Sequence, residues 1–183
     1  EPSGNPFNSL LQLEADHGIP RNPFINAGAL VICDILLEIC ENPKETLLEF
    51  IRDVAEDDEI FFNEKVAQSE MDHSYRNTAM CNFMKSFGNI HSKPNSVIDL
   101  YCHLCSIEMT CEQLSKSFLY LANGGRKPTD RLQILPYLKA KRINAILLTC
   151  GFYDESGEFS LLVGLPGKSG VGGGIIAILP QKY

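Results

Sequence analysis

Five polar residues of this sequence have the chemistry needed to bind and transform a small amino acid: Asn26, Glu70, Asn77, Tyr101 and Tyr153. The carboxylate of Glu70 suits an ammonium group, and the two side-chain amides and the phenol of Tyr101 suit a carboxylate. A second phenol, that of Tyr153, could move protons together with a lysine. These are the requirements of a free α-amino acid whose side-chain acyl group is attacked.

Four of these residues also have a purely structural interpretation. Asn26 stands just before a very apolar helix, where asparagine is a favourable N-cap, and Asn77 could be a second cap. Glu70 could be a surface carboxylate paired with Arg76. Tyr101 falls on the apolar face of its helix and could be a core tyrosine with a satisfied hydroxyl.

The stretch from Gly151 to Gly174, GFYDESGEFSLLVGLPGKSGVGGG, begins with a tyrosine in a turn and ends in a cluster of glycines. Its triplet Lys168-Ser169-Gly170, on a strand, matches a pattern of active-site serine acyl transferases, where it reads Lys-Thr-Gly. The glycines allow close approach to the backbone and leave N–H groups for a developing oxyanion. The alternative is an ordinary glycine loop before a strand, with Tyr153 packed in its turn.

The composition is that of a globular protein and excludes some partners. The chain has 183 residues, of which 44% are hydrophobic and 21% charged, enough for one domain with a sizeable core. Its net charge of −7 argues against nucleic acid and against an anionic membrane surface as partner. No apolar run reaches membrane-spanning length.

The cysteines and histidines show no metal-binding pattern. The seven cysteines are scattered among apolar residues, and the pair Cys102 and Cys105 lacks a second pair at zinc-finger spacing. We therefore expect small buried thiols in a reducing, cytoplasmic compartment. The four histidines show no ligand spacing, and we expect neither a metal nor a cofactor: His17, His73, His91 and His103.

The order of elements is a structured loop, a series of helices and a final hairpin. Residues 1–25, rich in Pro, Gly and Asn, are predicted as loop. A capping box of Thr110 and Gln113 opens one of the later helices. Helices are predicted over 27–40, 43–55, 64–71 and 75–87. Another begins at an Asn95 or Ser96 cap, and two more cover 110–122 and 139–150, the last with Gly151 as its C-cap.

The pattern then changes to two strands, 159–165 and 175–179, hinged at the glycine-rich turn. The predicted class is α/β (α+β), with a loop and helical cluster over 1–150 and a hairpin over 151–183. A lone hairpin has unpaired edges and cannot stand by itself. Because the chain also begins with Glu1, we expect a piece of a longer protein, cut at both ends.

Several stretches resemble the serine-dependent glutaminases of the β-lactamase/transpeptidase-like superfamily. They are EPSGNPFN at the start, GIPRNPFINAGAL, SE followed by RN, DLYCHLCSIEMT, LANGG, and GFYDESGEFSLLVGLPGKSGVGGG. The resemblance runs through the whole chain in unbroken order. It implies a mostly helical subdomain plus a C-terminal hairpin of an incomplete antiparallel sheet, forming part of a single catalytic domain.

The resemblance also implies an activity. Such enzymes hydrolyse L-glutamine to L-glutamate and ammonia through a covalent acyl-serine, without a cofactor. By position in the matching motifs, the substrate-binding residues would be Asn26, Glu70, Asn77, Tyr101, Tyr153 and Val171.

Roles within that set follow from the resemblance. Glu70 would bind the α-ammonium group, and Tyr153 would face the side-chain amide as the catalytic residue, activating the nucleophile or protonating ammonia. The backbone N–H of Val171 would lie in the oxyanion hole. The residues Lys168, Ser169 and Gly170 would support the site.

One element of the family pattern is missing. The family nucleophile stands in a Ser-x-x-Lys motif on a helix, and no serine here has a lysine three positions later. In relatives this motif precedes the stretch matching EPSG, and the family's last strand and C-terminal helix also fall outside these residues. We therefore expect the 183 residues alone to be inactive.

Two other functions remain open at this stage. The chain could be a non-catalytic, truncated homologue that binds an amino acid or only partner subunits. It could also be a related acyl-serine enzyme acting on β-lactams or peptides, although Glu70 favours a substrate with a free α-ammonium group. Family membership further implies a homo-oligomer.

Overall fold

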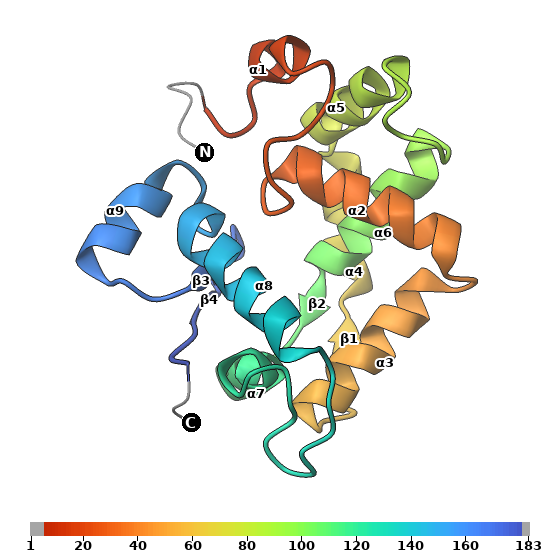
Figure 1. Ribbon diagram of the computed structural model, residues 1–183. Coiled ribbons are helices and arrows are strands. Elements are labelled where there is room, and N and C mark those ends of the chain that lie inside the picture. Colours follow the sequence, from red (N-terminus) through yellow and green to blue (C-terminus); the bar gives the residue numbers. More distant parts are fainter. Residues whose placement is uncertain (1–5, 181–183) are drawn as a thin grey trace. The chain divides into compact units, whose positions relative to one another are not determined.

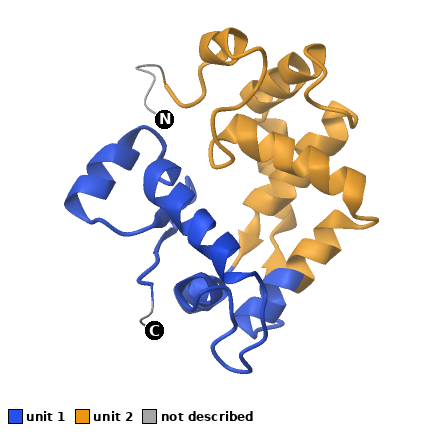
Figure 2. Cartoon of the chain, viewed as in Figure 1, with its two compact units in different colours: residues 1–2, 50–60, 109–183 blue, residues 3–49, 61–108 orange. Residues whose placement is uncertain are grey.

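The computed structural model describes residues 6–180 and divides them into two compact units (Figures 1 and 2). Residues 6–49 and 61–108, orange in Figure 2, form what we call the helical unit. Residues 50–60 and 109–180, blue in Figure 2, form the hairpin unit. Residues 1–5, which carry most of the EPSGNPFN motif, lie outside the described part.

The helical unit is built on four helices that pack against one another, α2, α4, α5 and α6. A short strand β1 (Phe61–Phe62) pairs antiparallel with β2 (Ile107–Glu108), which closes the segment between them. The helices of this unit are α1 (Leu10–Ala15), α2 (Asn26–Ile39), α4 (Glu64–Asp72), α5 (Tyr75–Ser86) and α6 (Pro94–Cys105). Helix α3 (Pro43–Ala55) follows α2 along the chain, and its residues from 50 onward are assigned to the hairpin unit.

One hydrophobic core holds these helices together. Its fully buried side chains include Leu30 of α2, Met80 and Met84 of α5, and Val97 and Leu100 of α6. Each buried side chain of this size stabilises the folded chain by roughly 1.5–3 kcal/mol. The core therefore fixes α2 against α5 and α6, which carry three of the six predicted binding residues, Asn26, Asn77 and Tyr101.

The hairpin unit contains two long helices and a short antiparallel pair of strands. The strand β3 (Gly167–Ser169) pairs with β4 (Ile175–Ala177), with Lys168 opposite Ile176. Helix α7 (Cys111–Ala122) packs on β4, and α8 (Tyr137–Cys150) packs on β3. The capping box of Thr110 and Gln113 is confirmed at the start of α7. The unit also includes a 3-10 turn η1 (Tyr153–Glu155) and helix α9 (Ser156–Leu162).

The expected strand over 159–165 is wrong, because most of this segment is helix α9. No strand of residues 6–180 pairs with it, so an extended segment would leave its backbone groups without partners. The helix satisfies them internally and is held by two contacts, one with Phe152 just after α8 and one with α8 itself. Phe159 stacks on Phe152 with ring centroids 3.6 Å apart, and the Ser160 hydroxyl donates to the Leu148 carbonyl.

The other expected elements agree with the structure, apart from three local errors. The region 1–25 is not all loop, since α1 lies within it, capped by Ser9. Helix α6 is capped at Lys93, with Pro94 in its first turn, and not at Asn95 or Ser96. The sequence pattern missed the two-residue strands β1 and β2 entirely. In residues 6–180, no helix has the length and apolar character needed to cross a membrane.

Candidate functional site

The Asn26 side chain does not cap helix α2, because another asparagine, Asn22, stabilises the turn before the helix. The Asn22 side chain accepts hydrogen bonds from the N–H groups of Phe24 and Ile25, at 2.9 and 3.1 Å. Helix α2 then begins with Ile25 as N-cap and Asn26 as its first residue. The N-cap interpretation of Asn26 is therefore wrong, and its amide is available for other contacts.

The Asn26 amide pairs with Asn77 across the helical unit. Its Nδ2 donates to Oδ1 of Asn77 at 3.1 Å, which joins α2 to α5 near the start of both helices. Asn77 lies inside the first turn of α5, whose N-cap is Ser74, so the second-cap interpretation is also wrong. The bond leaves the Asn77 amide N–H groups and the Asn26 carbonyl, both partly exposed, for a ligand.

Glu70 and Tyr101 both lie close enough to Cys105 to change the pKa of its thiol. The pKa of the Cys105 thiol is raised, mainly by desolvation by surrounding protein atoms, although part of its side chain reaches the surface. A hydrogen bond with the Tyr101 hydroxyl lowers this pKa, and the negative charge of Glu70 raises it. Sequence reasoning missed Cys105 because a thiol in a helix pattern carries no signal of its neighbours.

The structural interpretation offered from the sequence fails for Glu70 and holds for Tyr101. Glu70 is exposed on α4, and in residues 6–180 no ion pair joins it to Arg76, so the proposed surface pair is wrong. Tyr101 packs against the core, and its hydroxyl has a partner, as the core-tyrosine interpretation expected. Tyr101 is nevertheless partly exposed, so it can also contact a ligand.

Tyr153 is held in an unusual backbone conformation beside Lys168. Its φ of 51° lies in the left-handed region, where residues other than glycine are uncommon and are often found at functional sites. The Lys168 ammonium nitrogen lies 4.1 Å from the centroid of the Tyr153 ring and also donates to the carbonyl of Ser169. Burial lowers the pKa of Lys168. The simple-packing interpretation of Tyr153 does not account for this pairing.

The contact between Tyr153 and β3 depends on two glycines. A Cβ atom on Gly151 would lie only 1.7 Å from the carbonyl oxygen of Gly167, and one on Gly167 would lie 2.6 Å from that of Ile176. The N–H of Ser169 also donates to the Gly151 carbonyl at 3.2 Å. Only glycines allow the end of α8 to approach the hairpin this closely.

Val171 lies at the tip of the hairpin. The turn is closed by the N–H of Gly170, which donates to the Gly174 carbonyl at 2.7 Å, and by Gly173, with a φ of +96°. Val171 is 88% exposed, and its backbone N–H has no hydrogen-bond acceptor in the part of the chain described. That N–H is thus available to an external oxygen, as an oxyanion-hole donor would be.

The predicted residues therefore form two groups, each within one unit. The helical unit brings together Asn26 with Asn77, and Glu70 with Tyr101. The hairpin unit brings together Tyr153 with the segment 168–171. An apolar groove of about 530 Å³ between α7 and β4 includes none of these residues.

Comparison with known proteins identifies the family. The family model described as Glutaminase matches residues 1–183. The chain belongs to the glutaminase family. A glutaminase of Christiangramia forsetii is 57% identical over 183 residues, and the alignment covers all of this chain and 60% of that protein. This chain therefore spans about three fifths of the length of such glutaminases.

Solved structures agree with this assignment. A Bacillus subtilis protein described as a probable glutaminase superposes with a TM-score of 0.90 at 36% identity, covering 98% of this chain and 58% of that one. A second structure is a covalent complex between a Bacillus subtilis glutaminase and 5-oxo-L-norleucine; it superposes with a TM-score of 0.83 at 34% identity, covering 89% of this chain and 56% of its own. The expected family and the β-lactamase-like fold class are confirmed.

Proposed function

We propose that the protein containing this chain is an amidohydrolase that converts L-glutamine to L-glutamate and ammonia through an acyl-serine. The observation that carries the proposal is the glutaminase match along all 183 residues. The relative captured as a covalent complex with 5-oxo-L-norleucine supports a covalent step, because this ligand was attached by reaction of that protein with 6-diazo-5-oxo-L-norleucine.

The helical unit would recognise the amino-acid end of glutamine. The Glu70 carboxylate is exposed, and no cation of the described residues pairs with it, so it can bind the α-ammonium group. The Asn77 amide N–H groups and the Tyr101 hydroxyl can donate to the α-carboxylate, with Asn26 fixing the Asn77 amide. This recognition favours a free amino acid over a peptide, which lacks the α-ammonium group.

The hairpin unit would act on the side-chain amide. In the proposed reaction the lysine of the Ser-x-x-Lys motif takes the serine hydroxyl proton as Oγ bonds to the amide carbon, and the N–H of Val171 stabilises the resulting oxyanion. The Tyr153 hydroxyl gives a proton to the departing nitrogen, which leaves as ammonia. Water then adds to the ester and gives a proton to the Tyr153 phenolate, and the lysine returns its proton to the serine Oγ as glutamate is released. Lys168 stabilises the phenolate of Tyr153 between these proton transfers.

The attacking serine is proposed to lie outside these 183 residues, in a Ser-x-x-Lys motif that none of the chain's serines provides. With that motif, the chain would form a single catalytic domain, active as a homo-oligomer with L-glutamine as substrate. We also propose a cytoplasmic location, because all seven cysteines are free thiols.

The proposal is tested by measuring ammonia released from L-glutamine and L-asparagine by the intact protein. Tyr153→Phe should lower kcat by at least about 100-fold while KM changes less than about threefold, since it removes a proton-handling group and keeps the ring. The matched control is Tyr137→Phe, which removes an exposed hydroxyl at the start of α8 and should leave both constants unchanged.

Two outcomes would reject parts of this proposal. Binding of glutamine without ammonia release would favour the non-catalytic homologue. Release of ammonia with an unchanged kcat in Tyr153→Phe would keep the activity but remove Tyr153 from its proton transfers.

A further inference from the structure

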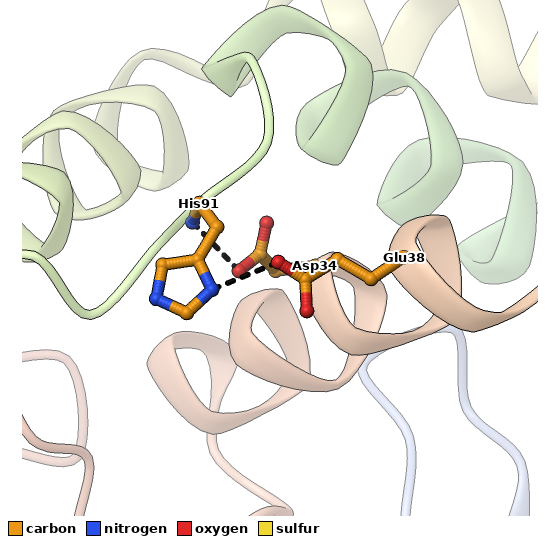
Figure 3. A group of neighbouring side chains, drawn as sticks. All are labelled: Asp34, Glu38 and His91. Atoms are coloured by element: carbon orange, nitrogen blue, oxygen red, sulfur yellow. Dashed lines mark hydrogen bonds and ion pairs between the residues drawn. The ribbon is translucent and has the colours of Figure 1, made fainter.

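Three side chains with metal-binding chemistry meet on the helical unit, apart from the residues proposed to bind glutamine. Asp34 and Glu38 lie four residues apart on α2, so both project from one face of the helix. His91 comes from the segment that joins α5 to α6. Figure 3 shows its imidazole turned toward Glu38, with Nδ1 2.8 Å from Oε1, and Asp34 beside them.

Asp34 is a fixed, charged member of this group. Its side chain is buried, with 3% of the residue exposed, and its two oxygens accept the N–H groups of His91 and Ser92 at 2.8 and 2.7 Å. The Ser92 hydroxyl donates to the same carboxylate, and no lysine or arginine of residues 6–180 forms an ion pair with it.

Lys85 also fixes the backbone of the segment that carries His91. The Lys85 ammonium group donates to the carbonyl oxygens of Ile90, His91 and Ser92, at 3.3, 3.1 and 3.0 Å. The backbone amides of this segment thus bind Asp34 while its carbonyls bind Lys85. The imidazole is presented beside the two carboxylates by a backbone that has little freedom to move.

We propose that Asp34, Glu38 and His91 bind a divalent transition-metal ion, with Zn²⁺ as the preferred ion. One ligand atom from each residue lies within 4.8 Å of the other two. A tetrahedral zinc ion with bonds of about 2.1 Å needs its ligand atoms about 3.4 Å apart. Rotation of Glu38 and His91, whose side chains are 44% and 68% exposed, can supply this adjustment.

The donor set favours zinc over magnesium or calcium. Imidazole nitrogen suits zinc and its neighbours in the transition series, whereas magnesium and calcium prefer oxygen donors. Asp34 accepts the N–H groups of His91 and Ser92 and the Ser92 hydroxyl, which leaves about one of the four lone-pair sites of its carboxylate for the metal. Two carboxylates beside a neutral imidazole carry two negative charges, which match a divalent cation, and water would complete the coordination.

A metal at this place would tie α2 to the segment between α5 and α6. The helices α2 and α5 carry Asn26 and Asn77 at their starts. The ion would thus stabilise the packing of these helices without touching the substrate or the reacting atoms. The sequence could not predict this, because His91 is more than fifty residues from both carboxylates.

The test is a titration of the intact, metal-free protein with zinc chloride, followed by calorimetry and by thermal unfolding. We expect one zinc ion per chain and a higher unfolding temperature. His91→Gln and Glu38→Gln should each weaken binding at least about tenfold and remove most of the temperature shift. The matched control, His73→Gln, removes an exposed imidazole that bonds only a backbone carbonyl and should bind zinc like the wild type.

Cobalt(II) distinguishes this site from the free cysteines. A site of one imidazole and two carboxylates gives weak visible bands, whereas a cobalt–thiolate site adds an intense charge-transfer band. The proposal is overturned if zinc does not bind, if both variants bind as tightly as the wild type, or if bound cobalt shows thiolate bands. Asp34 is not substituted, because its carboxylate also holds the backbone of His91 and Ser92.

Discussion

Gly151 is the position where a single added methyl group should be most informative. Its φ of −76° is ordinary for alanine, so Gly151→Ala adds no backbone strain by itself. Its Cβ, however, would lie 1.7 Å from the Gly167 oxygen and 2.6 Å from that of Leu147. Relief requires the end of α8 and β3 to separate by on the order of 1 Å, because both opposing atoms belong to the backbone.

The cost of this separation can be estimated. Overpacking costs typically 1–3 kcal/mol, and a clash between backbones belongs at the upper end, about 3 kcal/mol. For a protein of this size that corresponds to a fall in unfolding temperature of roughly 6–12 °C. The same separation would move Lys168 away from the Tyr153 ring, so kcat for glutamine should fall together with stability.

The assay is thermal unfolding followed by circular dichroism, together with ammonia release by the intact protein. Gly157→Ala is the matched control, because no atom lies within 4 Å of the added Cβ and the residue lies in α9. It should be unchanged or more stable by up to about 1 kcal/mol. If Gly151→Ala unfolds within about 2 °C of the control, close packing of Gly151 on Gly167 does not position Tyr153.

Three further predictions concern pairs and single groups. A double-mutant cycle on Asn26→Ala and Asn77→Ala should give a coupling of about 0.5–1.5 kcal/mol in unfolding free energy, and additive effects would contradict their hydrogen bond. The hydrogen bond that Lys127 donates to Asp53 raises the pKa of Lys127 above 10.5, so the stabilisation by this pair is complete below that pH and is lost as the pH rises through the raised pKa. Asp53→Asn should cost about 1 kcal/mol in urea unfolding at neutral pH, and the difference from wild type should shrink in alkali; a constant difference would contradict the charge interaction. Iodoacetamide followed by mass spectrometry should label exposed Cys111 first and Cys33 last, because burial raises the pKa of Cys33 to about 12; equal rates would contradict that burial.

The helices were predictable because their signals are local. The spacing of apolar residues in α2, the Thr110–Gln113 capping box and the Gly151 C-cap each act within a few residues. The segment 159–165 failed because a short apolar run fits either a strand or a helix, and partners elsewhere in the chain decide between them. No such partner strand exists in residues 6–180, and the Phe152–Phe159 stack favours α9.

The sequence proposes the candidate site as a set of residues, but it does not predict the contacts between them. The motifs pointed to Asn26 and Asn77 separately, and each also fitted a helix cap. Their mutual hydrogen bond joins residues 51 positions apart, which no local pattern encodes. Cys105, beside Tyr101, was hidden for the same reason, because its importance comes only from the side chains around it.

The two groups of site residues share one structural device. In the helical unit, a Cβ on Gly28 would lie 2.0 Å from the Asn22 oxygen, so only glycine allows the Asn22 turn to fold against α2 just before Asn26. In the hairpin unit, Gly151 allows the same close approach just before Tyr153. In each motif a glycine within two residues of the candidate site residue permits close backbone contact. That contact fixes the backbone position from which the side chain of the candidate site residue extends. The glycines in NPFINAGA and GFYD are thus proposed to position the candidate site residues, although neither carries a side chain that could touch a substrate.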